Sequence, residues 1–140
     1  MCACSHVLPC MRLLRWIPAA VILGCSWHLS SQSTIEYMPQ FWNADKLVHM
    51  LCFAGLSFWV AFGAGTQGTV RFRHVFPACF VSCYGIIDEI HQSYVPGRSC
   101  SVFDWCADTA GAVLGAIVFY RLSCCILHHY RCQRVQQPRR

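Results

Sequence analysis

Acidic residues are scarce in this chain: the 140 residues include only six, and they stand where carboxylates are costly. Two of them, Asp88 and Glu89, are adjacent within the apolar stretch YGIIDEIHQSYVPGR. A carboxylate pushed toward the centre of a bilayer costs about 2.5 to 3.5 kcal/mol on insertion scales, so such a group normally faces the interior of a helix bundle, or water, and finds a partner. Carboxylates beside imidazole and guanidinium groups can hold cations, move protons or orient an anion-binding arginine. The sequence therefore predicts a polar site around Asp88 and Glu89.

Three further pairs of polar residues lie four positions apart, a spacing that places both side chains on one helix face. The pairs are Asp45 with His49, Asp88 with Gln92, and Asp104 with Asp108. The nearest partners for the carboxylates are Lys46, His49, His91 and Arg98. We expect the Pro96-Gly97 turn to hold the Arg98 guanidinium above the carboxylates, where it can bond bidentately to carboxylate or phosphate. The candidate polar site comprises Asp45, Lys46, His49, Asp88, Glu89, Gln92, Arg98, Asp104 and Asp108.

The elements that carry these residues have the composition of a membrane protein. Hydrophobic residues make up 56% of the chain and charged residues 12%, about half the charged fraction of a soluble domain. Four apolar blocks, at about 11–29, 46–64, 75–91 and 103–127, each approach the roughly 20 residues that a helix needs to cross a bilayer. We predict an all-α integral membrane bundle of about four transmembrane helices. The same blocks define the domain organisation: an unassigned extension at 1–10, a transmembrane domain at 11–127 and a basic cytoplasmic tail at 128–140.

The basic residues predict the orientation of this bundle. With a cytoplasmic amino terminus, nine of the eleven lysines and arginines fall on the inner side, and only Lys46 and Arg98 are outside. Both termini are therefore predicted to be cytoplasmic. Five of the six acids then gather at the outer ends of helices, although acids were not used to set the orientation.

The first apolar block has a second interpretation. Its basic start, short apolar core and Ile-Leu-Gly-Cys sequence resemble a lipoprotein cleavage site at Cys25. Three spans would then remain, and a mature amino terminus at Cys25 would establish this. We favour a retained span because it fits the distribution of basic residues better.

The twelve cysteines and the net charge of +5 indicate no further class of function. Many cysteines lie within apolar runs, where a free thiol packs as a small apolar group. Cys124, Cys125, His128, His129 and Cys132 lack the paired spacing of a structural zinc site, so they are a weak metal signal. The basic residues are spread between apolar blocks without a nucleic-acid-binding motif, so we expect the lipid bilayer, and no nucleic acid, as a partner.

The fourth block has its own start and packing signals. Ser101-Val102-Phe103-Asp104 has the S-x-x-D form of a capping box, so Asp104 could serve the helix start alone. Gly111 and Gly115 form a G-x-x-x-G motif, which allows close approach of another helix, and we favour packing within the bundle over dimerisation. The oligomeric state stays open.

Three motifs together resemble the VanZ-like family of small multi-span bacterial membrane proteins. They are DKLVH (45–49), YGIIDEIHQSYVPGR (84–98) and SVFDWCADTAGAVLG (101–115), and Ser-Ser-Gln at 30–32 is similar to the family's segment after its first helix. The resemblance covers about residues 12–120 and implies the cytoplasmic membrane and a cell-envelope role. One departure is Asp108, where the family more often has Asn. The family's namesake is linked to teicoplanin resistance, but the resemblance supplies no reaction.

Three functions fit these residues. The first is a non-catalytic protein whose outer polar site binds a lipid-linked or phosphorylated envelope component, with the carboxylates orienting the cations or holding a divalent cation. The second is a membrane enzyme acting on a lipid or cell-wall precursor, with His49 or Glu89 as general base, although no nucleophile or metalloprotease motif is present. The third is a small transporter or proton relay, which is less favoured because the ionisable groups gather at one face. No catalytic residue and no metal ligand is assigned from the sequence.

Overall fold

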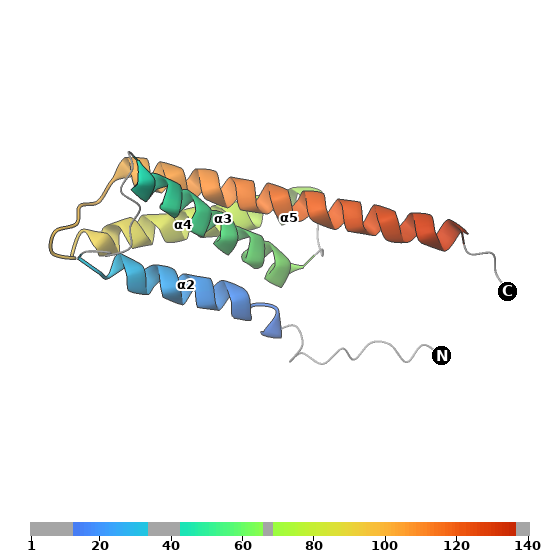
Figure 1. The fold of residues 1–140 in the computed structure, drawn as a ribbon, viewed down its shortest axis with the longest axis horizontal. Helices are drawn as coiled ribbons and strands as arrows, with labels where there is room; N and C mark the ends of the chain where they lie inside the picture. The colour runs from blue at the N-terminus through green and yellow to red at the C-terminus, as the bar shows by residue number, and fades with distance from the viewer. Residues whose placement is uncertain (1–12, 34–42, 66–68, 137–140) are drawn as a thin grey trace.

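The computed structural model describes residues 13–33, 43–65 and 69–136 (Figure 1). Four long helices and no strand are present in these ranges. They are α2 (Ile17–Ser30), α3 (Ala44–Ala64), α4 (Val70–Gln92) and α5 (Val102–Gln136). The prediction of an all-α fold is confirmed, and the predicted extension at 1–10 lies outside the described residues.

The helices run alternately in opposite directions (Figure 1). The carboxyl ends of α2 and α4 and the amino ends of α3 and α5 lie toward one end of the bundle. This arrangement brings Asp45, Asp88, Glu89 and Asp104 to the same end, although they are far apart in the sequence.

Hydroxyl side chains cap the starts of two helices. At α4 the backbone N–H of Phe72 donates to Thr69 Oγ1 at 3.2 Å, and at α5 the backbone N–H of Asp104 donates to Ser101 Oγ at 3.3 Å. Each hydroxyl satisfies one of the amides that a first helical turn leaves without a partner. The predicted start signal of the fourth apolar block therefore operates at Ser101.

The apolar core lies between α3 and α4, and α5 closes it. Phe53, Leu56 and Val60 of α3 are buried with Val81 of α4, and the rings of Phe53 and Tyr84 stack with centroids 5.7 Å apart. Because these side chains face inward, the polar residues one turn further toward the end of the bundle are turned inward with them.

Two glycines of α5 make the contact with α3. A Cβ built on Gly111 would overlap the carbonyl oxygen of Met50, and one built on Gly115 would overlap the carbonyl oxygen of Ala54. Both obstacles are backbone, which cannot rotate away. The two helices can therefore approach this closely only because neither position has a side chain.

Two of the four helices are long and apolar enough to cross a membrane. They are α3, with 21 residues, and the part of α5 from Val102 to Tyr130, with 29 residues. By contrast, α2 is a shorter apolar helix, and α4 carries Arg71, Arg73, Asp88 and Glu89 within its 23 residues. Of the four predicted spans, two therefore correspond to helices with the length and composition needed to cross a membrane.

The predicted boundary at residue 127 falls within α5. This helix continues without a break to Gln136 and extends beyond the other helices (Figure 1). The segment from 123 to 136 contains neither glycine nor proline, so nothing in it ends a helix. The nine described cysteines are all free, and eight of them are exposed.

The contact between α3 and α5 yields a stability prediction. Gly115→Ala forces a methyl group onto the Ala54 carbonyl and should lower the free energy of unfolding by about 1–3 kcal/mol, the usual cost of overpacking. Gly24→Ala in α2 is the matched control, since a Cβ at this position meets nothing within 4 Å. The control should be neutral or stabilising by up to about 1 kcal/mol through helix propensity. Denaturant unfolding of the purified protein in detergent measures both, and equal effects would contradict the proposed contact.

Candidate functional site

The outermost polar contact joins the starts of α3 and α5. Lys46 Nζ donates to Asp104 Oδ1 at 2.7 Å and to Asp45 Oδ2 at 3.1 Å. The side chains of Asp45 and Lys46 are 48% and 34% exposed, whereas that of Asp104 is 15% exposed. An ion pair with this exposure contributes about 0–1 kcal/mol to stability, so it fixes the helix ends rather than holding the bundle together.

One turn deeper, His49 of α3 and Asp108 of α5 face each other. His49 Nδ1 lies 3.0 Å from Asp108 Oδ1, and the carboxylate is completely buried. The contact is an ion pair when the imidazole is protonated and a hydrogen bond when it is neutral. Gly85 of α4 makes room for this carboxylate, because a Cβ at Gly85 would lie 3.2 Å from Asp108 Oδ2.

Glu89 connects α4 to the start of α5. The backbone N–H of Ser101 donates to Glu89 Oε2 at 2.6 Å. In an ordinary capping box the acid three residues after the cap accepts this bond. Here that acid is Asp104, which pairs with Lys46, and Glu89 accepts the bond from a different helix.

Asp88 is the centre of a third group, which connects α4 to α2. Ser30 Oγ donates to Asp88 Oδ2 at 2.8 Å, and Gln92 Nε2 donates to the same oxygen at 3.0 Å. Arg98 Nη2 donates to Gln92 Oε1 at 2.7 Å, so the guanidinium reaches the carboxylate only through the amide. The guanidinium was predicted to lie above the carboxylates, and its hydrogen bond is to the Gln92 amide that Asp88 holds.

The loop after α4 positions Arg98. The backbone N–H of Arg98 donates to the carbonyl of Val95 at 3.1 Å, and Gly97 between them has a φ of 83°. This is the geometry of a type II turn, with proline and glycine in their preferred positions. The turn returns the chain over the end of the bundle, which directs the arginine side chain inward.

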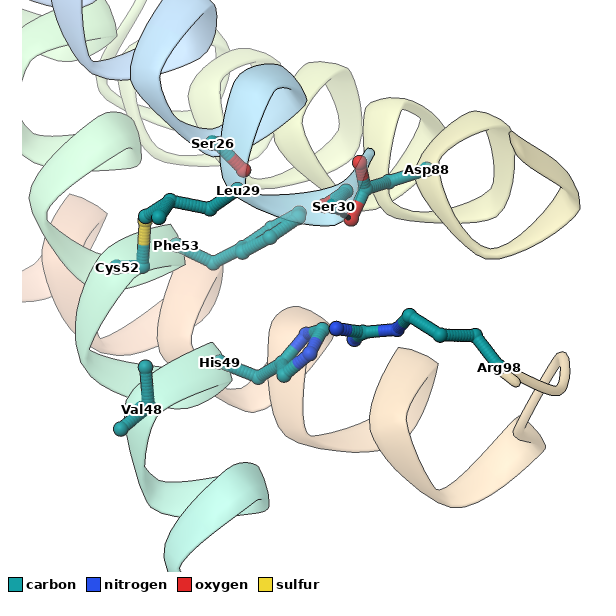
Figure 2. A pocket seen from close by; sticks show the side chains of 9 residues that line it. All are labelled: Ser26, Leu29, Ser30, Val48, His49, Cys52, Phe53, Asp88 and Arg98. Carbon is teal, nitrogen blue, oxygen red and sulfur yellow. Dashed lines mark hydrogen bonds between the residues drawn. The ribbon is translucent and has the colours of Figure 1, made fainter. Parts of the chain in front are cut away.

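A small cavity of about 50 Å³ lies between these groups and is lined by Ser26, Leu29, Ser30, Val48, His49, Cys52, Phe53, Asp88 and Arg98. Figure 2 shows His49 and Arg98 extending toward one another from α3 and from the loop after α4, with Asp88 and Ser30 on the opposite wall. The walls are mostly apolar but include Ser30, His49, Asp88 and Arg98, and the volume is sufficient for a water molecule or an ion.

Three buried carboxylates each have, among the described residues, a hydrogen-bond partner for only one of their two oxygens. Asp88, Glu89 and Asp108 are 0%, 3% and 0% exposed, and one oxygen of each accepts a hydrogen bond. The other oxygens, Asp88 Oδ1, Glu89 Oε1 and Asp108 Oδ2, are buried without a hydrogen-bond partner in the described part of the chain. A buried polar atom without a partner costs about 1–3 kcal/mol, and more when it is charged.

The structure brings together most, but not all, of the residues predicted from helical spacing. His91 points away from Asp88: its Nε2 contacts Ser31 Oγ at 3.0 Å, and its ring stacks on Trp27. Asp45 contacts Lys46 rather than His49. Spacing alone did not identify Ser30 as the partner of Asp88, although Ser-Ser-Gln at 30–32 had marked the segment as similar to the family.

Comparison with known families matches the VanZ/LLP1 profile to residues 7–126. The chain belongs to the VanZ/LLP1 family. The resemblance seen in the three motifs is thus confirmed, over a range that contains every residue of the candidate site. No curated protein and no solved structure matches this VanZ/LLP1 chain. Its site is therefore interpreted from its own geometry.

The contact between His49 and Asp108 yields a double-mutant prediction. His49→Ala leaves both Asp108 oxygens without a partner and should lower the free energy of unfolding by about 1–3 kcal/mol. In the Asp108→Asn background, the same change removes a bond to a neutral amide and should cost at least about 0.5 kcal/mol less. His91→Ala is the control, since His91 contacts Ser31 and Trp27, and its effect should be the same in both backgrounds. Equal costs for His49→Ala in both backgrounds would contradict a coupling with Asp108.

Proposed function

We propose that this VanZ/LLP1 protein is a multi-pass protein of the bacterial cytoplasmic membrane with a role in the cell envelope. In this proposal it binds the phosphorylated headgroup of an envelope component in the polar site at the outer membrane face. The observation that carries the proposal is Arg98: its guanidinium lines a cavity that it shares with Asp88 and His49, and it donates a hydrogen bond to the Gln92 amide.

The distribution of polar and apolar side chains supports a membrane location. On α4, Ile86, Ile87 and Ile90 are 45%, 55% and 51% exposed, while the neighbouring Asp88 and Glu89 are buried. On α5, further large aliphatic side chains are exposed, among them Val113, Leu114, Ile117, Val118 and Leu122. A soluble domain would place charges outward. Lipid is the solvent that favours aliphatic groups outside and ionisable groups inside.

Charge segregation supports the proposed orientation. Arg73 and Arg121 lie toward the end of the bundle where α4 begins and α5 continues, opposite to Lys46 and Arg98. Arginine and lysine are enriched on the cytoplasmic side of membrane proteins. The site containing Arg98 would then face outward.

Arg98 has the chemistry to bind a phosphoryl group. Its guanidinium offers five N–H donors, and among the described residues its one hydrogen bond is to Gln92 Oε1. Gln92 is held in turn by Asp88, so the orientation of the arginine is fixed before a ligand arrives. Arginine bonds to phosphate with paired, charge-assisted hydrogen bonds, which are about twice as strong as neutral ones.

The proposed topology can be tested with reporter fusions. Alkaline phosphatase fused after residue 98 should be active, because the enzyme folds only outside the cytoplasm, whereas a fusion after residue 140 should be inactive. Green fluorescent protein at the same two positions should give the opposite pattern. The reverse pattern at both positions would invert the proposed orientation, and equal activities at both would exclude a bundle that places them on different sides.

The headgroup proposal can be tested by lipid binding to the purified protein. We expect it to bind phosphatidylglycerol in neutral detergent more tightly than phosphatidylcholine. Arg98→Ala should weaken the phosphatidylglycerol affinity at least tenfold, because charge-assisted hydrogen bonds contribute about 1.5–3 kcal/mol. Arg98→Lys should lose part of the affinity, since it keeps the charge but not the planar pair of donors.

The matched control for this experiment is Arg121→Ala, which removes the same charge from an exposed position on α5. Its affinity for phosphatidylglycerol should remain within about twofold of the unaltered protein, as expected for a distant surface charge. If Arg98→Ala and Arg121→Ala weakened binding equally, the interaction would be nonspecific electrostatic attraction, and the assignment to the cavity would be wrong.

A further inference from the structure

Three side chains from three helices converge at the bottom of the polar site. His49 of α3, Glu89 of α4 and Asp108 of α5 each offer a nitrogen or oxygen atom, and these atoms all lie within 4.8 Å of one another. Among the described residues, this is the one group of three or more histidine, cysteine and acidic side chains with such convergence. The cysteines and histidines near the end of α5 do not form another.

The unsatisfied oxygens point to what the group holds. Glu89 Oε1 and Asp108 Oδ2 are buried without a hydrogen-bond partner among the described residues, and both side chains are at least 97% buried. Carboxylates taken out of water cost several kcal/mol each unless a positive charge compensates them. Two such oxygens beside one imidazole offer acceptors with no donor facing them.

The local charge also favours a cation. The candidate site contains five carboxylates, from Asp45, Asp88, Glu89, Asp104 and Asp108, against the two permanent cations Lys46 and Arg98. Lys46 is engaged by Asp45 and Asp104, and Arg98 by Gln92. Neither permanent cation contacts Glu89 or Asp108 in the described structure.

We propose that His49, Glu89 and Asp108 form a binding site for one divalent first-row transition-metal ion of the Mn²⁺ and Zn²⁺ class. The separation of 3.0 Å between His49 Nδ1 and Asp108 Oδ1 matches that of neighbouring ligands on one ion. Metal–ligand bonds of about 2.0–2.2 Å at tetrahedral or octahedral angles place adjacent ligands about 3–3.4 Å apart. One imidazole with two carboxylates suits these ions, whereas Ca²⁺ takes six to eight oxygens.

The ion would connect this group to the cavity that contains Arg98, since His49 lines both. Three protein ligands leave a coordination position open for water or another oxygen ligand. If the proposed headgroup function holds, that ligand is a phosphoryl oxygen, and the ion offsets the carboxylate charge that would otherwise repel it. This last step rests on the headgroup proposal, whereas the metal site itself does not.

The metal site is tested without lipid. The purified full-length protein, stripped of metal with a chelator, is titrated with Mn²⁺, and the free ion is followed by electron paramagnetic resonance. Mn²⁺ is the probe because it disfavours the thiolates of this cysteine-rich chain. We expect one Mn²⁺ per chain. His49→Ala, Glu89→Gln and Asp108→Asn should each weaken the affinity at least tenfold. His91→Ala is the matched control, because this histidine contacts Ser31 and Trp27 and lies outside the group, and it should leave the affinity within twofold.

Two further measurements separate loss of the site from loss of the fold. Mn²⁺ should raise the thermal unfolding temperature of the unaltered protein and of His91→Ala, but not of the three ligand variants, because a ligand stabilises only the state that binds it. Pulsed resonance spectra of bound Mn²⁺ should contain modulation from a directly bound nitrogen, which His49→Ala removes.

Absence of stoichiometric Mn²⁺ binding up to millimolar concentration would overturn the metal proposal, as would binding that all three ligand variants retain. The result is separable from the test of Arg98. If the protein binds Mn²⁺ but Arg98→Ala does not change its lipid affinity, the metal site stands and the headgroup function is rejected. If Arg98→Ala weakens lipid binding but no Mn²⁺ binds, the headgroup function stands and the metal site is rejected.

Discussion

Three buried carboxylates determine how this bundle is assembled. Each has one oxygen bonded to a different helix: Asp88 accepts from Ser30 of α2, Glu89 from the backbone at the start of α5, and Asp108 contacts His49 of α3. Together the three contacts connect α2 to α4, α4 to α5, and α5 to α3, so they link all four helices. A carboxylate in apolar surroundings tolerates few positions, because moving it away from its donor leaves a buried charge without compensation. These bonds therefore restrict the helix register more sharply than the aliphatic contacts do.

Small residues make this arrangement sterically feasible. Gly85 admits the Asp108 carboxylate between α4 and α5, while Gly111 and Gly115 bring the backbone of α5 against that of α3. With larger side chains at these positions the helices would stand further apart, and His49 could not reach Asp108. The glycines set the distance between helices, and the carboxylates set the register, so each depends on the other.

The sequence allowed the broad outline of this structure to be predicted. Hydrophobic blocks of near-spanning length located the four helices, and helical spacing identified the bond between Asp88 and Gln92, four residues apart. Contacts between helices were harder to predict. Asp45 and His49 have the same four-residue spacing as Asp88 and Gln92, yet they do not pair. Asp45 bonds instead to Lys46, which lies between Asp45 and Asp104 and bonds to both. The bond from the Ser101 amide to Glu89 could not be predicted from periodicity. It joins two helices, and periodicity within each helix does not determine how the two are rotated relative to each other.

Gln92 explains why the arginine of this site is not simply neutralised by the nearest carboxylate. A guanidinium placed directly on Asp88 would form a bidentate pair, and most of its donors would be consumed. Instead the amide separates the two charges: its nitrogen donates to Asp88, and its oxygen accepts from Arg98. An amide suits this position because it carries a donor nitrogen and an acceptor oxygen on the same carbon, whereas an ionised carboxylate only accepts and a lysine only donates. The carboxylate thus orients the arginine without pairing with it, and the positive charge remains directed toward the cavity shared with His49.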